Sequence, residues 1–313
     1  MTSDVAAEQC TALGAAEPLI ESYQSHEIKL GGLSVYRALP VRGRRLIGPW
    51  CFLDRFGPVS FTEGKPMDVG AHPHIGLQTV SWLLEGEIVH HDSLGNEALL
   101  RPGGVNIMTT GRGIAHAEQT PRPNTGRLNG VQLWTALPET DRHRGASFHN
   151  IVQAPTLSLP GSETRVFSGG LDSVTSAAEH FSPIVGADVS VHAGESTTLP
   201  LRKDFEHGLL LLSGDCAFEG QPLAENVLYY LGAGRSEGRL KTAQGARLLL
   251  VGGVPFPETI LMWWNFVART PDEIRDARTD WETRQRFGEI PSFHGTRIPS
   301  PELMRLAAPH PAS

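Results

Sequence analysis

Short apolar stretches broken by turn residues run from residue 28 to about residue 137. The turn signals between them are Gly-Gly, Gly-Pro, Leu-Gly-Asn and Pro-Gly-Gly, and the stretches at residues 33–36, 79–84 and 131–134 are rich in residues that favour strands. No long helical period interrupts this pattern, and strands do not alternate with helices as a parallel sheet requires. The pattern therefore predicts a β-barrel or sandwich.

A second turn-rich β region follows a polar, proline-containing stretch at about residues 138–160. Its expected strands lie at residues 189–191, 208–212, 227–231 and 246–251. Two halves of similar rhythm predict a duplicated barrel. We therefore expect a flexible N-terminus at residues 1–18, a first barrel at 19–145, and a second barrel with a helix and a surface tail at 146–313.

One helix is well signalled near the end of the chain. Thr270 suits the N-cap, Pro271 the first helical position, and Glu273 closes a capping box. An apolar stripe at helical spacing follows, made of Ile274, Ala277 and Trp281. We expect this helix to pack on a barrel wall, with Trp281 in packing rather than in binding.

Composition narrows the class of protein. The chain has 313 residues, 40% hydrophobic and 19% charged, which is typical of a soluble protein of two domains. Its formal net charge of -7 argues against binding to nucleic acid or anionic lipid. Three separated cysteines form no disulfide framework, and no apolar run reaches membrane-spanning length. With no signal segment at the N-terminus, these features predict a cytoplasmic protein.

Two histidine-containing pairs carry the candidate chemistry: His72-Pro73-His74, and, about forty residues later, His116-Ala117-Glu118. Residues at i and i+2 on a strand point to the same side, so each pair can direct two ligand atoms into one barrel interior. Imidazole nitrogens with one carboxylate suit iron, manganese, copper, nickel or zinc, whereas calcium or magnesium would want more oxygens. Either pair alone could instead be two solvated residues at a strand edge.

Other histidines fit a metal site less well. His90 and His91 are adjacent, so at most one can enter the barrel, and the turn beside them predicts a position at the rim. His180, His192 and His207 are isolated in the second half, where we expect surface or hydrogen-bonded core histidines. The sequence thus predicts one metal per chain.

Around these residues the sequence resembles the pirin family of the cupin superfamily. The resemblance rests on residues 48–58 (GPWCFLDRFGP), 72–80 (HPHIGLQTV) and 108–118 (MTTGRGIAHAE), with weaker support at 248–274. It implies an all-β fold of two cupin (jelly-roll) barrels in tandem with a short C-terminal helix. It also implies one metal in the N-terminal barrel, usually iron (Fe²⁺, with manganese, copper, nickel, zinc or cobalt as alternatives), held by His72, His74, His116 and Glu118.

The sequence departs from the broader cupin pattern at Gln78, where a ligand glutamate would stand four residues beyond the second histidine. Glu118 would supply the charge instead. Gln78 is expected to share the inward parity of the histidine pair and to hydrogen-bond around the ligands. Trp82 and Ile114 share that parity on their expected strands and could line the pocket, although core packing is the stronger expectation for each.

Three functions follow from this site. The resemblance implies a quercetin 2,3-dioxygenase-like enzyme acting on flavonol-like aromatic compounds, with Glu118 as both ligand and general base. The second hypothesis is a metal-dependent protein-interaction partner or transcriptional co-regulator without turnover, whose partner would be a protein rather than DNA. The third is a metal-binding barrel with a different small substrate.

Overall fold

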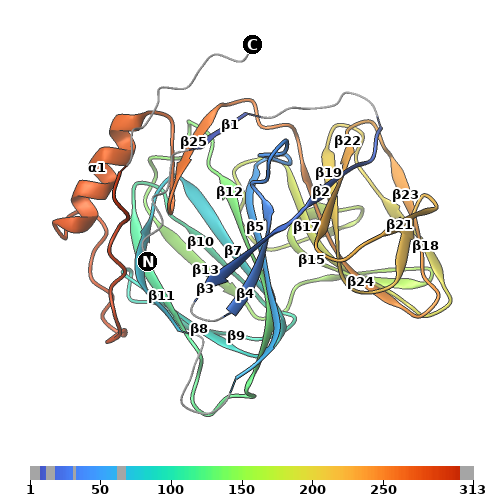
Figure 1. Cartoon of the computed structure of the whole chain (residues 1–313), viewed down its shortest axis with the longest axis horizontal. Coiled ribbons are helices and arrows are strands. Elements are labelled where there is room, and N and C mark those ends of the chain that lie inside the picture. Colours follow the sequence, from blue (N-terminus) through green and yellow to red (C-terminus); the bar gives the residue numbers. More distant parts are fainter. Residues whose placement is uncertain (1–7, 12–17, 31–32, 62–67, 304–313) are drawn as a thin grey trace.

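Two β-barrels lie side by side, with one helix on the outer wall of the first (Figure 1). The computed structural model describes residues 8–11, 18–30, 33–61 and 68–303. Every strand pair in it is antiparallel, except for isolated parallel bridges. In this part of the chain no helix has both the length and the apolar character needed to span a bilayer.

The first barrel combines a large and a small sheet. The large sheet has seven strands in the order β13 (Ser147–Ile151), β10 (Val105–Thr109), β7 (Leu77–Glu85), β12 (Arg127–Ala136), β5 (Trp50–Ser60), β4 (Leu33–Leu39) and β3 (His26–Leu30). The small sheet has four, in the order β6 (Val69–His74), β11 (Ile114–Gln119), β8 (Ile88–Asp92) and β9 (Glu97–Leu100).

The second barrel repeats this plan. Its large sheet runs in the order β14 (Thr156–Leu159), β15 (Ser162–Leu171), β17 (Ile184–Val191), β24 (Ala246–Gly253), β19 (Glu206–Gly214), β22 (Val227–Gly232) and β2 (Glu21–Gln24), with β16 (Val174–Thr175) paired to β15. Its small sheet runs in the order β18 (Ser196–Pro200), β23 (Glu237–Lys241), β20 (Cys216–Phe218) and β21 (Gln221–Leu223). The predicted all-β architecture of two tandem cupin barrels is confirmed.

The C-terminal segment returns to the first barrel. β25 (Ile260–Trp263) and β26 (Phe266–Ala268) form a three-stranded sheet with β1 (Glu8–Cys10), and α1 (Pro271–Glu282) follows. Thr270 caps α1 with the predicted capping box, and its buried stripe is the predicted Ile274, Ala277 and Trp281. This stripe packs with Ala115 and Ala117 on the outer face of β11, so the helix covers the wall behind the predicted ligands.

The two halves also exchange strands. β2 pairs with β22 at the edge of the second large sheet, and β13 pairs with β10 at the edge of the first. These pairings cross the expected division between residues 145 and 146 in both directions. The domain bounds 19–145 and 146–313 stay a prediction. Of the N-terminal segment expected to be flexible, Glu8–Cys10 is paired with β25, and residues 1–7 and 12–17 lie outside the described residues.

The large sheets of the two barrels pack face to face. One buried cluster combines Val80, Trp82 and Leu133 of the first sheet with Phe167 and Leu249 of the second. Residues at alternate positions point the opposite way, into the first barrel. Several of these are polar: Ser81 Oγ donates to Gln132 Oε1 at 2.8 Å, and Asn150 Nδ2 donates to Asn106 Oδ1 at 2.6 Å.

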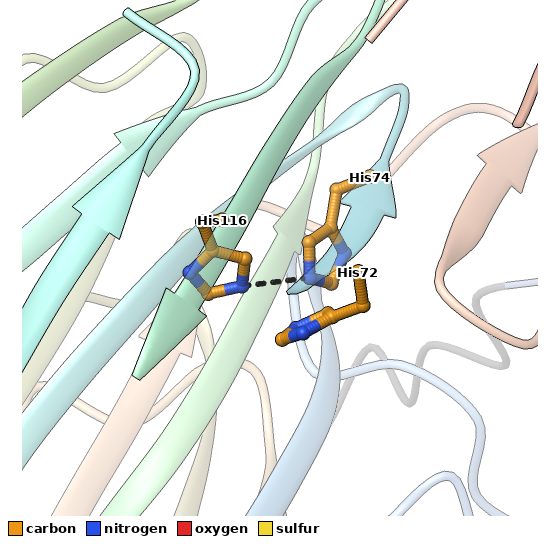
Figure 2. A group of neighbouring side chains, drawn as sticks. All are labelled: His72, His74 and His116. Atoms are coloured by element: carbon orange, nitrogen blue, oxygen red, sulfur yellow. Dashed lines mark hydrogen bonds between the residues drawn. The ribbon is translucent and has the colours of Figure 1, made fainter. Parts of the chain in front are cut away.

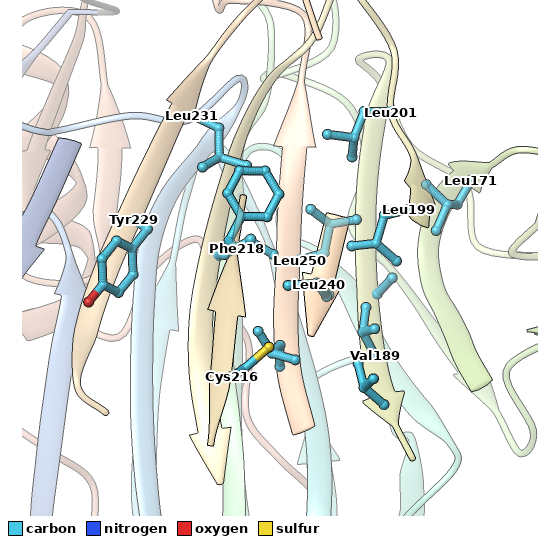
Figure 3. Close-up of a cluster of buried hydrophobic side chains, with 14 of the residues drawn as sticks. Leu171, Val189, Leu199, Leu201, Cys216, Phe218, Tyr229, Leu231, Leu240 and Leu250 are labelled. Atoms are coloured by element: carbon cyan, nitrogen blue, oxygen red, sulfur yellow. The ribbon is translucent and has the colours of Figure 1, made fainter. Parts of the chain in front are cut away.

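The interior of the second barrel is apolar instead (Figure 3). In the strand pair that matches β6 and β11, β18 and β23, the buried side chains include Leu199 and Leu240, and Phe218 packs beside them. The leucine and phenylalanine side chains named here have no atom that can bind a metal. The two barrels therefore share topology but differ in what their interiors can bind.

Candidate metal centre

Local sequence explains how β6 presents its two histidines. Pro73 lacks a backbone N–H, which is tolerated because β6 is the edge strand of the small sheet. His72 and His74 flank it and so project to one face. The strand ends at His74, and the turn that follows contains Gly76, which has a φ of +71° and where a Cβ would lie 2.0 Å from the carbonyl oxygen of Val267. Glycine is required at this turn because both the backbone conformation and the space exclude a side chain.

Three of the four predicted ligands come together inside the first barrel (Figure 2). His116 of β11 lies directly opposite His72 of β6, and Ile114 opposite His74. One ligand nitrogen from each of His72, His74 and His116 lies within 4.8 Å of the others. Among the described residues they form the one such group of three or more potential metal ligands.

The three rings are buried and electrically neutral. His72 is 8% exposed, His74 1% and His116 3%. Burial lowers the pKa of His72 to about 4 and places the pKa values of His74 and His116 well below their usual range. Neutral imidazole is the form that binds a metal, because the lone pair is then available.

Hydrogen bonds orient two of these lone pairs. His72 Nδ1 lies 2.8 Å from the carbonyl oxygen of Gly70, and His74 Nδ1 lies 3.1 Å from that of Asn265. A carbonyl oxygen only accepts, so each Nδ1 carries the proton and each Nε2 keeps its lone pair. Backbone carbonyls commonly fix metal-binding histidines in this way. The donor chemistry therefore fits a transition-metal ion.

Glu118 lies on the same strand as His116 but outside the group of three. β11 is irregular between these residues: His116 is opposite His72, whereas Glu118 is opposite Val69. The carboxylate has no hydrogen bond or ion pair with any described residue, and burial raises its pKa. Its assignment as the fourth ligand stays a prediction.

Aromatic side chains border the histidines on one side. The Trp134 ring meets His74 edge to face at 5.2 Å, and Phe52 stacks on Trp134 at 3.9 Å. The Arg37 guanidinium lies 4.5 Å from the centre of the Phe52 ring and pairs with Asp54. Arg37 is 31% exposed, so this row leads from solvent toward the buried imidazoles. This row could not be recognised from the sequence, because its members are far apart in the chain.

The prediction that His90 and His91 lie at the rim is wrong. They are 3% and 5% exposed, respectively. His91 faces the C-terminal segment, where its Nδ1 lies 2.8 Å from Ser292 Oγ, while the His90 ring lies 5.3 Å from that of His116. The alternation of faces was predicted correctly. The burial was missed because the covering residues come from distant parts of the sequence.

The prediction that Gln78 shares the inward parity of the histidine pair is also wrong. Its side chain bonds Thr109 and the carbonyl oxygen of Glu179, and its Oε1 lies 3.2 Å from Nδ1 of His180. The turn at Gly76 separates β6 from β7, which belong to different sheets, so parity is not carried across. Gln78 therefore faces the second half of the chain.

The expected packing role of Trp82 is confirmed. It is fully buried between the barrels, where its Nε1 donates to Asp188 Oδ2 at 2.9 Å. Ile114 is also buried, and it alternates with Ala115 and Ala117, which face α1. Ile114 therefore shares the inner face with His116, and it stays a candidate for lining the site.

The isolated histidines of the second half differ from one another. His192 is exposed, His180 bonds Gln78, and His207 is 1% exposed. No described residue bonds Nδ1 of His207. None of the three joins a metal-binding group in the described part of the chain, and all three cysteines are free.

Comparisons with known proteins agree with this architecture. The family model described as Pirin matches residues 32–135, and the one described as Pirin C-terminal cupin domain matches residues 186–288. The chain is 42% identical over 274 residues to a Pseudomonas aeruginosa protein named "Putative quercetin 2,3-dioxygenase", covering 87% of each chain. It is 34% identical over 281 residues to a pirin-like protein from Caulobacter vibrioides, covering 87% of this chain and 96% of that protein.

A solved structure is similar over nearly the whole molecule. The crystal structure of quercetin 2,3-dioxygenase from Acinetobacter baumannii superposes with a TM-score of 0.88 at 40% sequence identity. The match covers 92% of this chain and 97% of that one. The similarity therefore includes both barrels.

Proposed function

Because the chain belongs to the pirin family, a group of cupin proteins with two barrels, we propose that it is a metal-dependent dioxygenase acting on flavonol-like aromatic compounds. The observation that carries the proposal is the group of three neutral imidazoles whose ligand nitrogens face one another inside the first barrel. Similarity to proteins named as quercetin 2,3-dioxygenases supports the substrate class.

The four predicted ligands would have two roles, metal binding and proton transfer. His72, His74 and His116 would hold Fe²⁺, with Glu118 as the fourth ligand. Bound there, the ion would supply redox chemistry toward dioxygen, and the residues around it would hold an enolisable substrate beside it. Glu118 would accept the proton of the substrate hydroxyl, since a carboxylate beside the reacting group can act as a general base.

The row of Trp134 and Phe52 suits the shape of the proposed substrate. A flat aromatic molecule gains stacking and apolar contact beside such rings. Arg37 lies at the exposed end of the row, where its ion pair with Asp54 holds the guanidinium over the Phe52 ring. These residues would orient the substrate and exclude water, while Glu118 handles its proton.

A direct assay tests the proposal. Protein loaded with Fe²⁺ without oxygen is mixed with quercetin in air, and oxygen uptake and flavonol absorbance are followed together. Loss of both in a 1:1 ratio is expected for wild-type protein, and neither for His74→Ala. A fully iron-loaded protein that consumes no oxygen and leaves quercetin intact would contradict the dioxygenase proposal.

One observation favours the second candidate function, a metal-dependent interaction protein without turnover. The carbonyl oxygen of Asn265 accepts from His74 Nδ1, and Asn265 lies in the turn between β25 and β26, just before α1. The histidine group is thereby linked to an outer surface of the molecule. Hydrogen exchange in β26 and α1 that changes on metal binding, together with an inert quercetin assay, would favour this function over the enzyme.

A further inference from the structure

His90 lies beside the histidine group and is held on both sides. It is opposite Glu118 in the pairing of β8 with β11, and Asp92 is opposite His116. The His90 ring stacks on Phe148 of the large sheet, with ring centres 4.1 Å apart and planes 4° from parallel. Its Nε2 lies 3.0 Å from Asp92 Oδ2, and its Nδ1 lies 3.5 Å from His116 Nδ1. Both ring nitrogens are therefore directed at named partners.

Asp92 is fixed in its turn. It is fully buried, and its Oδ1 accepts from the backbone N–H groups of Leu94 and Asn96. The Asn96 side chain donates to both carboxylate oxygens. A carboxylate with these hydrogen bonds stays in place, and it accepts a hydrogen bond from His90 rather than donating one.

The proton positions follow from these contacts. Because ionised Asp92 only accepts, His90 Nε2 carries a proton, and His90 Nδ1 keeps its lone pair in the neutral ring. The contact between the two Nδ1 atoms then requires the proton to be on His116. His116 Nε2 is left with a lone pair, pointing to His74 Nε2 at 3.1 Å.

We propose that His90 and Asp92 are positioning residues for the metal centre, in a relay Asp92–His90–His116 that sets the tautomer and ring orientation of His116. The inference rests on the proposed metal site. His72 and His74 are oriented by backbone carbonyls, which no side-chain substitution removes, whereas His116 depends on this pair of side chains. The alignment of His116 can thus be altered by a substitution at His90 or Asp92, with all of the proposed ligands left in place.

The test measures Ni²⁺ affinity by competition with a chromophoric chelator, and records the visible absorption of bound Ni²⁺. His90→Phe keeps a flat ring against Phe148 but offers His116 no acceptor. His90→Gln restores the polarity, because an amide oxygen can accept from His116 while its NH₂ donates to Asp92. His91→Phe, at the neighbouring residue that faces Ser292, is the matched control.

We expect His90→Phe to bind Ni²⁺ about 10- to 100-fold more weakly, with a changed absorption spectrum, as for other losses of hydrogen-bonding partners behind metal ligands. His90→Gln should recover most of the affinity and the wild-type spectrum, and His91→Phe should keep both. If His90→Phe does not fold, Asp92→Asn takes its place. That substitution keeps an acceptor for the turn but removes the charge facing His90, and weaker Ni²⁺ binding is expected.

Two results would overturn the relay. One is a folded His90→Phe variant with wild-type affinity and spectrum, and the other is equal weakening by the phenylalanine and glutamine variants. Failure of the proposed function gives a different result. A wild-type protein that binds no Ni²⁺ would overturn both proposals, whereas one that binds Ni²⁺ with the expected variant pattern but leaves quercetin intact would overturn only the enzyme.

Discussion

The Nε2 atoms of His74 and His116 lie 3.1 Å apart inside the first barrel. His74 Nε2 has a lone pair because the proton is on Nδ1, and the relay through His90 gives His116 the same arrangement. Two lone pairs directed at each other repel, and a cation between the rings would replace this repulsion with two bonds.

Metal binding should therefore stabilise the fold. With free Ni²⁺ or Fe²⁺ at 100 times its dissociation constant, the free energy of unfolding should rise by about 2.7 kcal/mol, and a chelator should reverse the change. Thermal unfolding of metal-free and metal-loaded protein measures this. Identical Tm values under saturating metal would contradict a site in the folded state.

Removing one of the proposed histidine ligands should abolish tight metal binding without unfolding the protein. His74→Ala should lose tight metal binding because two imidazoles remain, and the stability of the metal-free protein should change less than that of the loaded one. Elemental analysis and urea unfolding measure the two effects. His192→Ala, at an exposed histidine of the second barrel, is the control and should keep one metal per chain.

The Glu118→Gln substitution distinguishes the proposed role of this carboxylate as a general base from its proposed role as a metal ligand. If the carboxylate acts as the general base, kcat should fall by about 10²- to 10⁴-fold. Metal content measured on the same sample shows whether the ion is kept. Glu97→Gln, at an exposed carboxylate, is the control and should leave kcat unchanged. Full activity in metal-loaded Glu118→Gln would exclude the catalytic role.

Substitution of Trp82, which lies in the contact between the two barrels, should lower the stability of the protein. Trp82→Phe removes the hydrogen bond to Asp188 and leaves space in a fully buried cluster, so the free energy of unfolding should fall by about 1–3 kcal/mol. Urea unfolding measures this. Val152→Ala, at a side chain 80% exposed, should have little effect, and an equal loss in both variants would contradict the role of Trp82.

Acid should destabilise the protein partly through His207. Burial lowers its pKa to about 4, whereas the unfolded chain takes up a proton near the ordinary value of 6.5. The unfolded state binds more protons between these values, so the stabilisation is complete above about pH 6.5 and is lost as the pH falls toward 4. Urea unfolding of wild-type protein and His207→Gln across this range measures the difference.

The variant should lose less stability on acidification, by up to about 1.4 kcal/mol per pH unit for one proton. His192→Gln, which replaces an exposed histidine, should follow the wild-type curve. Parallel curves for His207→Gln and wild type would show that His207 takes up no extra proton on unfolding.

The local part of the site could be predicted from the sequence. The i, i+2 spacing of His72 and His74 determines their shared face once β6 forms, and the capping residues of α1 determine where the helix begins. Apolar stretches bounded by glycine turns likewise located the main strands. Each of these properties depends on neighbours within one strand or one turn of helix.

The remainder depends on contacts between distant residues. The orientation of Gln78 differs from the prediction because the turn at Gly76, which has a positive φ, separates β6 from β7, a strand of another sheet. His90 lies beside the site because Phe148 and Asp92 enclose it. β2 belongs to the second barrel because it pairs with β22, which lies far along the chain. No periodicity within a window of residues contains this information.

The exchange of strands has a consequence for synthesis on the ribosome. β2 leaves the ribosome early, but it can pair only after β22 has been synthesised. Gln24, for example, bonds Asn226, which is 202 residues later in the chain. The partner of His74 Nδ1, the carbonyl oxygen of Asn265, is likewise synthesised 191 residues after His74. The strands of the first barrel's two sheets all lie within residues 26–151, so they can pair before residue 265 is synthesised, whereas the hydrogen bond that orients His74 cannot form until then. The ion would therefore meet a fully oriented His74 only after the strands of the second barrel have also been synthesised.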